Sequence, residues 1–278
     1  MNYPDRPLLR EKERYQQAVA EAQKTMQGVR VGALKQGFAA EEDPSAPEGT
    51  RETSEAVRRA VARCGELGAQ LKEVSIPEFS NAADIMFSAM IESATAAVRG
   101  WPTGYHWLSE SSPHLAAGLH NGLGSYADEL PETFKVVMML GKYLNGYYGG
   151  AIGARAQAMA RIVRSAIDGA LEQVDVLVLP TTTHYAHKHE PEASISKRAL
   201  RGWGMLANAP AFNVSGHPAL SMPAASANGL PVGVMVVGRR FMDAQLLSFA
   251  RTYEQAYGWE PAAPQPIAAL RAPRLSVS

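Results

Sequence analysis

Three histidines and a glutamate lie close together in the segment from His184 to Glu190. Imidazole nitrogens and carboxylate oxygens are common ligands of zinc and similar cations. The histidines stand three and two positions apart, so binding one shared metal would require a bent loop rather than one face of a helix. The segment is therefore either a metal site, which would suit a metal-dependent hydrolase, or a solvated loop. In both cases it follows a predicted buried strand, where α/β proteins bind their ligands.

The serines are the candidates for a nucleophile, because amide hydrolysis needs a nucleophile, a base that takes its proton and donors for the oxyanion. A glycine-rich turn such as Gly-x-Ser-x-Gly lets a serine project from a sharp bend. The serines beside glycine or proline lack that setting: Ser112, Ser125 and Ser215. We interpret His217, two positions after Ser215, as a loop or packing histidine rather than a base. The residues alone predict no catalytic serine.

The glycine-rich segments do not predict a cofactor site. Residues 146–150 lie between helical patterns and lack the lysine–serine pair of a phosphate-binding loop. Residues 229–231 are typical of a hairpin turn. We therefore expect no cofactor.

Hydrophobic periodicity predicts the elements that must position these residues. Residues 28–34 and 71–77 read as strands, and an amphipathic helix with an apolar face from Ala56 to Leu67 lies between them. Such a strand–helix–strand unit is long enough to support a parallel pair. Residues 81–174 are mostly helical, with a loop expected at 100–124.

The last third of the chain predicts buried strands. Residues 176–179 are apolar throughout, and residues 232–237 read the same way, as strands covered on both faces by helices. A final helix is expected at 243–257, and the proline-rich residues 261–278 are expected to form an extended tail. The fold class is α/β.

Composition excludes several classes of partner. The 278 residues are 46% hydrophobic and 19% charged, which favours a globular fold, and 27 basic residues balance 27 acidic ones. No basic field is therefore available for nucleic acid or an anionic membrane. The single cysteine, Cys64, excludes an internal disulfide framework, and no window supplies the roughly 20 apolar residues of a membrane span. We expect a cytoplasmic protein.

Three segments in the last third occur in a recognisable order: Asp175–Thr181, Asn213–Pro223 and Gly229–Arg239. Together they resemble the C-terminal region of amidase-signature enzymes, and the resemblance covers about residues 15–260. It implies a mixed β-sheet flanked by helices and the hydrolysis of small carboxamides. Residues 130–133 and the helix carrying Tyr147 look most like the small-molecule bacterial amidases, which are often enantioselective.

The resemblance implies that the chain lacks catalytic residues. The family uses a serine nucleophile, a second serine and a lysine, which lie before the region matched here, so no catalytic residue is carried over. What the resemblance assigns is one wall of the substrate cleft. We expect two groups of residues to approach it: Thr181, Thr182 and Thr183, and then Asn213, Ser215 and Gly216.

Two interpretations of the whole chain follow from the resemblance. In the first, residues 1–278 are the C-terminal part of a single amidase-signature domain, incomplete at its N-terminal side and inactive alone. Such a part would expose apolar faces and strand edges, so we expect self-association or a partner chain that supplies the missing part. In the second, the chain is a non-catalytic binding or assembly subunit that retains the fold.

Overall fold

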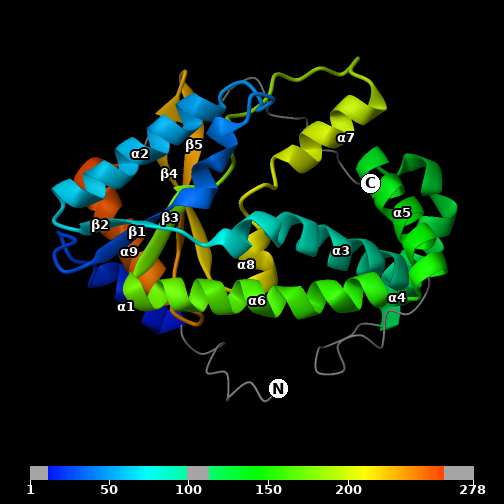
Figure 1. The fold of residues 1–278 in the computed structure, drawn as a ribbon, viewed down its shortest axis with the longest axis horizontal. Coiled ribbons are helices and arrows are strands. Elements are labelled where there is room, and N and C mark those ends of the chain that lie inside the picture. The colour runs from blue at the N-terminus through cyan, green and yellow to red at the C-terminus, as the bar shows by residue number, and fades with distance from the viewer. Residues whose placement is uncertain (1–11, 99–112, 260–278) are drawn as a thin grey trace, which may run out of the picture.

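The computed structural model describes residues 12–98 and 113–259 of the chain. A twisted mixed sheet with helices on both faces forms one part of the molecule, and a layer of long helices extends from it (Figure 1). This arrangement confirms the predicted α/β class and the predicted mixed sheet flanked by helices.

Two strands precede the long helical stretch of the described chain, and three strands follow it. The strands are Arg30–Leu34 (β1), Gln70–Val74 (β2), Val176–Pro180 (β3), Ala219–Ala227 (β4) and Leu230–Val237 (β5). The α-helices are Lys12–Ala20 (α1), Thr50–Glu66 (α2), Ala82–Val98 (α3), Pro113–Ser125 (α4), Glu132–Tyr148 (α5), Ala151–Gln173 (α6), Ile195–Gly204 (α7), Pro210–Ser215 (α8) and Asp243–Tyr257 (α9). The 3₁₀ helices are Lys35–Glu42 (η1), Pro77–Asn81 (η2) and Ala127–Glu129 (η3).

The sheet has the strand order β2-β1-β3-β5-β4. Strand β1 pairs in parallel with both β2 and β3, which confirms the parallel pairing predicted for the strand–helix–strand unit. Strand β5 pairs antiparallel with β3 and β4, and a hairpin turn joins β4 to β5 where residues 229–231 predicted one. Because β3 lies at the centre of the order, it has a hydrogen-bonded neighbour on each side.

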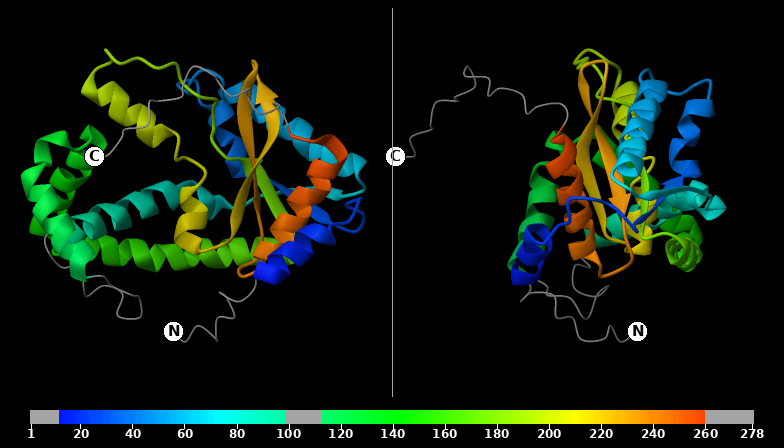
Figure 2. Two further views of the ribbon diagram at one scale, coloured as in Figure 1. Left: turned by 180° about the vertical axis from the view of Figure 1, so that it is seen from behind. Right: turned by 90° about the vertical axis from the view of Figure 1, so that its left-hand side faces the viewer.

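Helices cover both faces of this sheet. Helix α2 lies on one face, and α1 and α9 lie on the other (Figure 2). Helices α3 and α6 run side by side away from the sheet towards α4 and α5, while α8 packs between the sheet and this helical layer (Figure 1). The coverage explains why each residue of β3 is buried, as its apolar sequence predicts.

Two expected loops are helical instead. The expected loop at 100–124 was wrong from Pro113 onward, where α4 begins with a proline that is pre-organised for a first helical turn; residues 100–112 lie outside the described residues. The expected loop around Asn213 and Ser215 is the last turn of α8. Gly216 caps that helix with a left-handed φ of 74°, which favours glycine. The predicted tail at 261–278 lies outside the described residues.

Cys64 lies in the core. Its side chain on α2 is 2% exposed, and burial raises the pKa of its thiol to about 12. The thiolate is the reactive form of cysteine, so this residue acts as a small apolar side chain at neutral pH.

An ion pair ties the start of β3 to the start of β1. The Asp175 carboxylate accepts hydrogen bonds from the backbone N–H of Arg30 at 2.9 Å, from its Nε at 3.3 Å and from its Nη2 at 2.7 Å. Hydrogen bonding from the Arg30 side chain is the main cause that lowers the pKa of Asp175 below its usual range. Because the pairing uses both carboxylate oxygens and a backbone group, it fixes the register of the two parallel strands.

We expect Asp175→Asn to lower the melting temperature by roughly 2–4 °C at pH 7. A carboxylate whose pKa is depressed in the folded state stabilises the protein above its unfolded pKa, and that stabilisation is lost as the pH falls through the folded pKa. The difference between variant and wild type should therefore shrink below about pH 4. Calorimetry between pH 3 and 8 measures it, with the exposed Asp128→Asn as the control. A difference that stays constant down to pH 3 would contradict this assignment.

Candidate functional site

The carboxyl end of β3 is held by a buried amide. Asn208, 3% exposed, donates from Nδ2 to the carbonyl of Pro180 at 2.8 Å and to the carbonyl of Gly37 at 3.0 Å. Buried backbone carbonyls need donors, and this one side chain serves the last residue of β3 and the helix that follows β1. The backbone N–H of Thr181 donates to the carbonyl of Gly233 at 2.9 Å, which fixes where the chain leaves the sheet.

The three threonines predicted to approach a cleft form the turn beyond this point. The hydroxyls of Thr181 and Ser221 lie 2.7 Å apart. Thr182 donates to the carbonyl of His184 at 2.9 Å, and the Thr183 hydroxyl lies 3.2 Å from Nδ1 of His184. These contacts hold the turn in place, and Thr183 is itself buried. Whether the threonines also touch a substrate remains a prediction.

Two histidines follow the turn as a contacting pair. The Nε2 atoms of His184 and His187 lie 2.8 Å apart, with ring centroids at 4.3 Å. His184 is completely buried, and this burial, followed by the charge of His187, lowers the pKa of His184. The interpretation of this segment as a solvated loop is therefore wrong for His184, although His189 and Glu190 are exposed.

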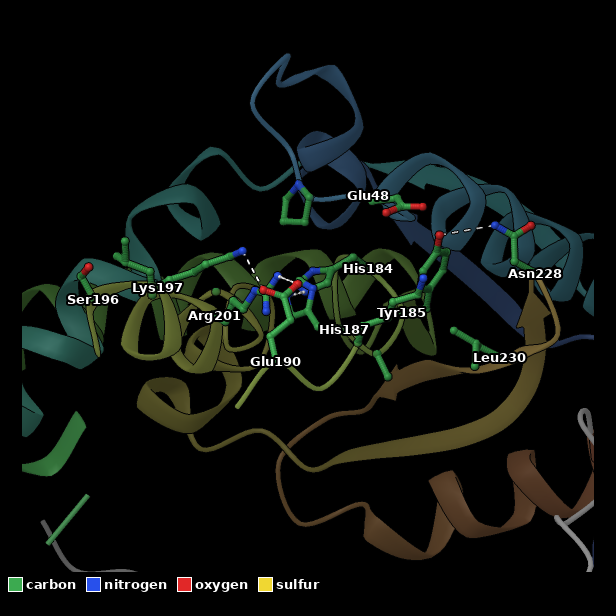
Figure 3. Close-up of a pocket in the computed structure, with 15 residues that line it drawn as sticks. Glu48, His184, Tyr185, His187, Glu190, Ser196, Lys197, Arg201, Asn228 and Leu230 are labelled. Atoms are coloured by element: carbon green, nitrogen blue, oxygen red, sulfur yellow. Dashed lines mark hydrogen bonds and ion pairs between the residues drawn. The ribbon is translucent and has the colours of Figure 1, made fainter. Parts of the chain in front are cut away.

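The histidine pair borders a groove of about 860 Å³. Figure 3 shows the pair at its centre, with Glu48 above, the turn carrying Asn228 and Leu230 on one side and Lys197 and Arg201 on the other. Tyr185 packs against Gly49 so closely that a Cβ atom on Gly49 would lie 2.2 Å from the ring. Gly49 also has a φ of 88°, so both space and backbone conformation require glycine there.

Helix α7 contributes positive charge to the groove. Lys197 donates to the Glu190 carboxylate at 2.7 Å and Arg201 donates to it at 2.9 Å. Hydrogen bonds from Arg201 first and Lys197 second lower the pKa of Glu190 to about 2, so this carboxylate is ionised at any physiological pH. The two cations are spaced four positions apart and share one face of α7.

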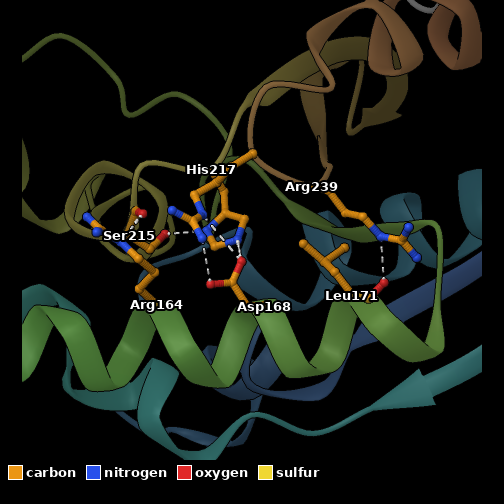
Figure 4. Close-up of polar contacts among 7 residues, drawn as sticks. Arg164, Asp168, Leu171, Ser215, His217 and Arg239 are labelled. Carbon is orange, nitrogen blue, oxygen red and sulfur yellow. Dashed lines mark hydrogen bonds and ion pairs between the residues drawn. The ribbon is translucent and has the colours of Figure 1, made fainter. Parts of the chain in front are cut away.

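The second predicted group, Asn213, Ser215 and Gly216, lies on and after α8. Asn213 is exposed and its Nδ2 lies 3.7 Å from Sδ of Met86 on α3. Ser215 is completely buried, and its hydroxyl lies 2.9 Å from Nδ1 of His217 (Figure 4).

Ser215 is the buried start of a polar chain that continues to Asp168, whose side chain is 40% exposed. Nε2 of His217 lies 3.2 Å from Oδ1 of Asp168 on α6, and Arg240 donates to both oxygens of Asp168. Burial lowers the pKa of His217 despite the nearby carboxylate. The order serine, histidine, aspartate resembles a catalytic triad in its connections. However, a fully buried hydroxyl offers no approach to a substrate, and Arg164 donates to the carbonyl of Ser215 at 2.8 Å. We interpret this series of hydrogen bonds as a structural clamp between α8 and α6.

The structure does not bring the two predicted groups together at one end of the sheet. The threonines follow the carboxyl end of β3. Strand β4, which begins just after Gly216, starts at Ala219 opposite Val237, and Val237 pairs with Leu177 near the amino end of β3. Ser215 and Gly216 therefore lie towards the opposite end of the sheet.

A shared metal ion finds no ligand set in this region. Within residues 12–98 and 113–259, no three histidine, cysteine, aspartate or glutamate side chains are placed to hold a cation. His184 and His187 contact each other, but His189 does not line the groove. A metal-dependent hydrolase built on this loop therefore lacks structural support.

Several residues of the candidate site, some lining the groove and one holding the end of β3, were missed from the sequence. Lys197 and Arg201 carried a detectable signal, because they lie shortly after Glu190 at a spacing of four positions, which places two side chains on one face of a helix. Glu48 and Asn208 carried none, since their positions depend on contacts with segments distant in the chain.

Comparison with known families decides the ancestry of this fold. The Amidase family model matches residues 3–247. The chain belongs to the amidase-signature family. The match confirms the resemblance inferred from the three C-terminal segments.

Individual relatives place the chain within the family. An enantioselective amidase of Rhodococcus rhodochrous is 31% identical over 87% of this chain, and a glutamyl-tRNA(Gln) amidotransferase subunit of Azotobacter vinelandii is 30% identical over 89%. These alignments cover 46% and 49% of the two relatives, so the chain spans about half of their length. An uncharacterized Rhodococcus erythropolis protein from the nthA 5′ region is 40% identical over 59% of this chain and 82% of its own length.

A solved structure shares the fold. The 6-aminohexanoate cyclic dimer hydrolase in complex with its substrate superposes with a TM-score of 0.62 and 23% identity, over 90% of this chain and 49% of that one. In the part of the chain that the structure describes, no helix combines the length and apolar character that crossing a membrane demands.

We expect Ser215 to be unreactive towards a fluorophosphonate probe, because its hydroxyl is fully buried and hydrogen-bonded to His217. Mass spectrometry of the folded chain after labelling measures the modification of Ser215. Ser215→Ala should lower stability by about 1 kcal/mol through the lost hydrogen bond, and Ser125→Ala, an exposed serine, is the control. Stoichiometric labelling of Ser215 would contradict the clamp interpretation and make it a nucleophile.

Proposed function

We propose that this chain is part of an amide-bond hydrolase acting on small carboxamides. The family match over residues 3–247 carries the proposal. The groove at the carboxyl end of β3 supports it, because ligands of α/β proteins bind beyond the carboxyl ends of parallel strands. In this proposal the Thr181–Thr183 turn forms a wall of the substrate cleft and the chain works in a reducing, cytoplasmic compartment.

The nucleophile of the reaction comes, in our proposal, from sequence that these 278 residues do not include. Amide hydrolysis needs a nucleophile with a base beside it and an open approach for the substrate. Ser215 has the histidine but not the approach, since it is fully buried. A glycine–serine-rich segment and a lysine, as the family resemblance implies, would supply nucleophile and proton reservoir from the missing part of a single amidase-signature domain.

We expect the chain alone to release no ammonia from aliphatic or aromatic carboxamides above the buffer rate. Addition of the separately produced N-terminal half of a family relative, which carries the serines and lysine, should restore turnover. The same addition to Ser215→Ala should restore it equally, because Ser215 takes no part in the chemistry. Ammonia release by the wild-type chain alone, abolished in Ser215→Ala, would overturn the proposal.

A second candidate is a non-catalytic binding or assembly subunit. The relative from Azotobacter vinelandii is itself one subunit of an amidotransferase, which favours a chain that works in an assembly. A stripe of exposed apolar side chains on α5 supports the same view, because such stripes mark interaction surfaces. Its members follow one helical face: Val136, Met139, Leu140, Tyr143 and Tyr147. Affinity for an amide or carboxylate without turnover in the mixed-halves experiment would favour this candidate.

We expect the purified chain to self-associate. The Met139 and Tyr147 side chains on α5 are 73% and 75% exposed, and water disfavours such contiguous apolar surface. Sedimentation velocity should show species larger than the 29.9 kDa monomer, and Met139→Glu should shift the distribution towards monomer. Gln157→Glu, an exposed change on α6, is the control and should leave the distribution unchanged. A cooperative, monomeric wild-type chain would contradict the expectation.

A further inference from the structure

We propose that the groove between the histidine pair and α7 binds a small carboxylate that has an apolar body. The binding groups are His187, backed by His184, together with Lys197 and Arg201. All of these groups belong to this chain, so binding can be measured on it without any amide turnover. Under the proposed function, on which this identification of the ligand rests, such a molecule is the acid that amide hydrolysis releases.

The imidazole pair has two arrangements of its protons. When Nε2–H of His184 donates to Nε2 of His187, Nδ1 of His184 accepts from the Thr183 hydroxyl and the proton of His187 lies on Nδ1. When His187 donates instead, His184 carries its proton on Nδ1 and Nδ1 of His187 is an acceptor. The His187 ring thus presents either a donor or an acceptor to a ligand, and an anion selects the donor form.

The cations of α7 already hold a carboxylate. Lys197 and Arg201 both donate to Glu190, at 2.7 and 2.9 Å, and so demonstrate a geometry that suits two carboxylate oxygens. Arg201 is 28% exposed at its side chain and borders the groove, so a ligand carboxylate can reach it. Glu190 is consequently an internal competitor for the ligand.

The charge of the groove favours an anion. At neutral pH its lining carries the cations of Lys188, Lys197 and Arg201 and the carboxylates of Glu48 and Glu190, a net charge of +1 before any protonation of the histidines. Among the described residues that line the groove, the charged or titratable side chains are these five groups, the two histidines and the Tyr185 phenol. They come from the loop after β3, from α7 and from the segment before α2.

Apolar side chains also line the groove, and in this proposal they contact the apolar body of the ligand. The contributing side chains come from four segments: Pro47, Tyr185, Ala186, Leu200 and Leu230. The Tyr185 ring is fixed in place against Gly49, and its hydroxyl accepts a hydrogen bond from Asn228 at 3.4 Å. A rigid aromatic wall beside a cationic rim fits an aryl or short alkyl acid, whereas a phosphate would leave the apolar wall without a partner.

Ligand binding should take up a proton. In the free groove, burial and the neighbouring ring keep the pKa of His184 below its usual range, which favours the neutral form of this imidazole. A bound carboxylate stabilises the cationic pair, because an opposite charge within a few ångströms favours the charged form. Affinity should therefore rise as the pH falls, until the carboxylate of the ligand itself becomes protonated.

The first experiment compares benzoate with benzamide by isothermal titration calorimetry of the whole chain. These probes have the same aromatic body, and the amide lacks the charge. At pH 6, benzoate should bind about tenfold more tightly than benzamide, because only benzoate carries a charge that the cations of the groove attract. The affinity for benzoate at pH 6 should exceed its affinity at pH 8 by about tenfold. Equal binding of the two probes, or no binding of benzoate, would overturn the proposal.

Substitutions then test the named residues. Glu190→Gln removes the competing carboxylate and should tighten benzoate binding about tenfold, a gain that misfolding cannot produce. Glu192→Gln, nearby and outside the groove, should change nothing. His187→Gln should abolish the pH dependence, while His189→Gln, in the same loop but outside the groove, should retain it. Unchanged affinity in Glu190→Gln, or unchanged pH dependence in His187→Gln, would refute the assignment, whatever the outcome of the amide-turnover experiment.

Discussion

The hydrogen bonds of one buried amide decide the shape of the candidate site. The carbonyl of Pro180 ends the central strand, and the carbonyl of Gly37 belongs to the helix that follows the neighbouring strand. Left without donors inside the protein, each would cost about 1–3 kcal/mol. The single side chain of Asn208 satisfies both. It thereby joins the ends of two parallel strands to the chain segment that leads into α8, and the turn that leads to the groove begins directly after this junction.

The burial of β3 extends into the turn that follows it. The strand is buried along its whole length, and Thr183 and His184 after it are buried as well. Each polar group of the turn then needs an internal partner, and the Thr182 and Thr183 hydroxyls find theirs on His184. His184 is completely buried, and its Nδ1 atom lies beside the Thr183 hydroxyl. Its Nε2 atom contacts Nε2 of His187. The contact between the two imidazoles is therefore a consequence of the burial of His184.

The sequence predicted the elements better than the site. Apolar runs and glycine boundaries located β1, β3 and β5 and the final helix, because periodicity reports directly which faces are buried. The α4 helix and the last turn of α8 were missed, since glycine and serine content obscured their helical spacing. Asn208 could not be identified at all, because nothing local shows that an asparagine will meet two carbonyls, one of them 171 positions away. The lowered pKa of His184 depends on its burial, which is likewise a property of the fold.

Comparing the hydrogen bonds of His217 with those of the His184–His187 pair shows that connectivity alone does not define a chemical role. Ser215, His217 and Asp168 are joined in the order of a hydrolytic triad, yet the serine at the end of α8 has no exposed surface, and an arginine holds its carbonyl. His184 and His187 have no nucleophile between them, yet they border open volume beside fixed cations. Access and local charge, rather than the identity of the bonded neighbours, therefore separate a clamp from a binding site. By that criterion the groove at the carboxyl end of β3, which is open to a ligand, is the candidate binding site of this chain. The polar chain at the opposite end of the sheet holds α8 against α6.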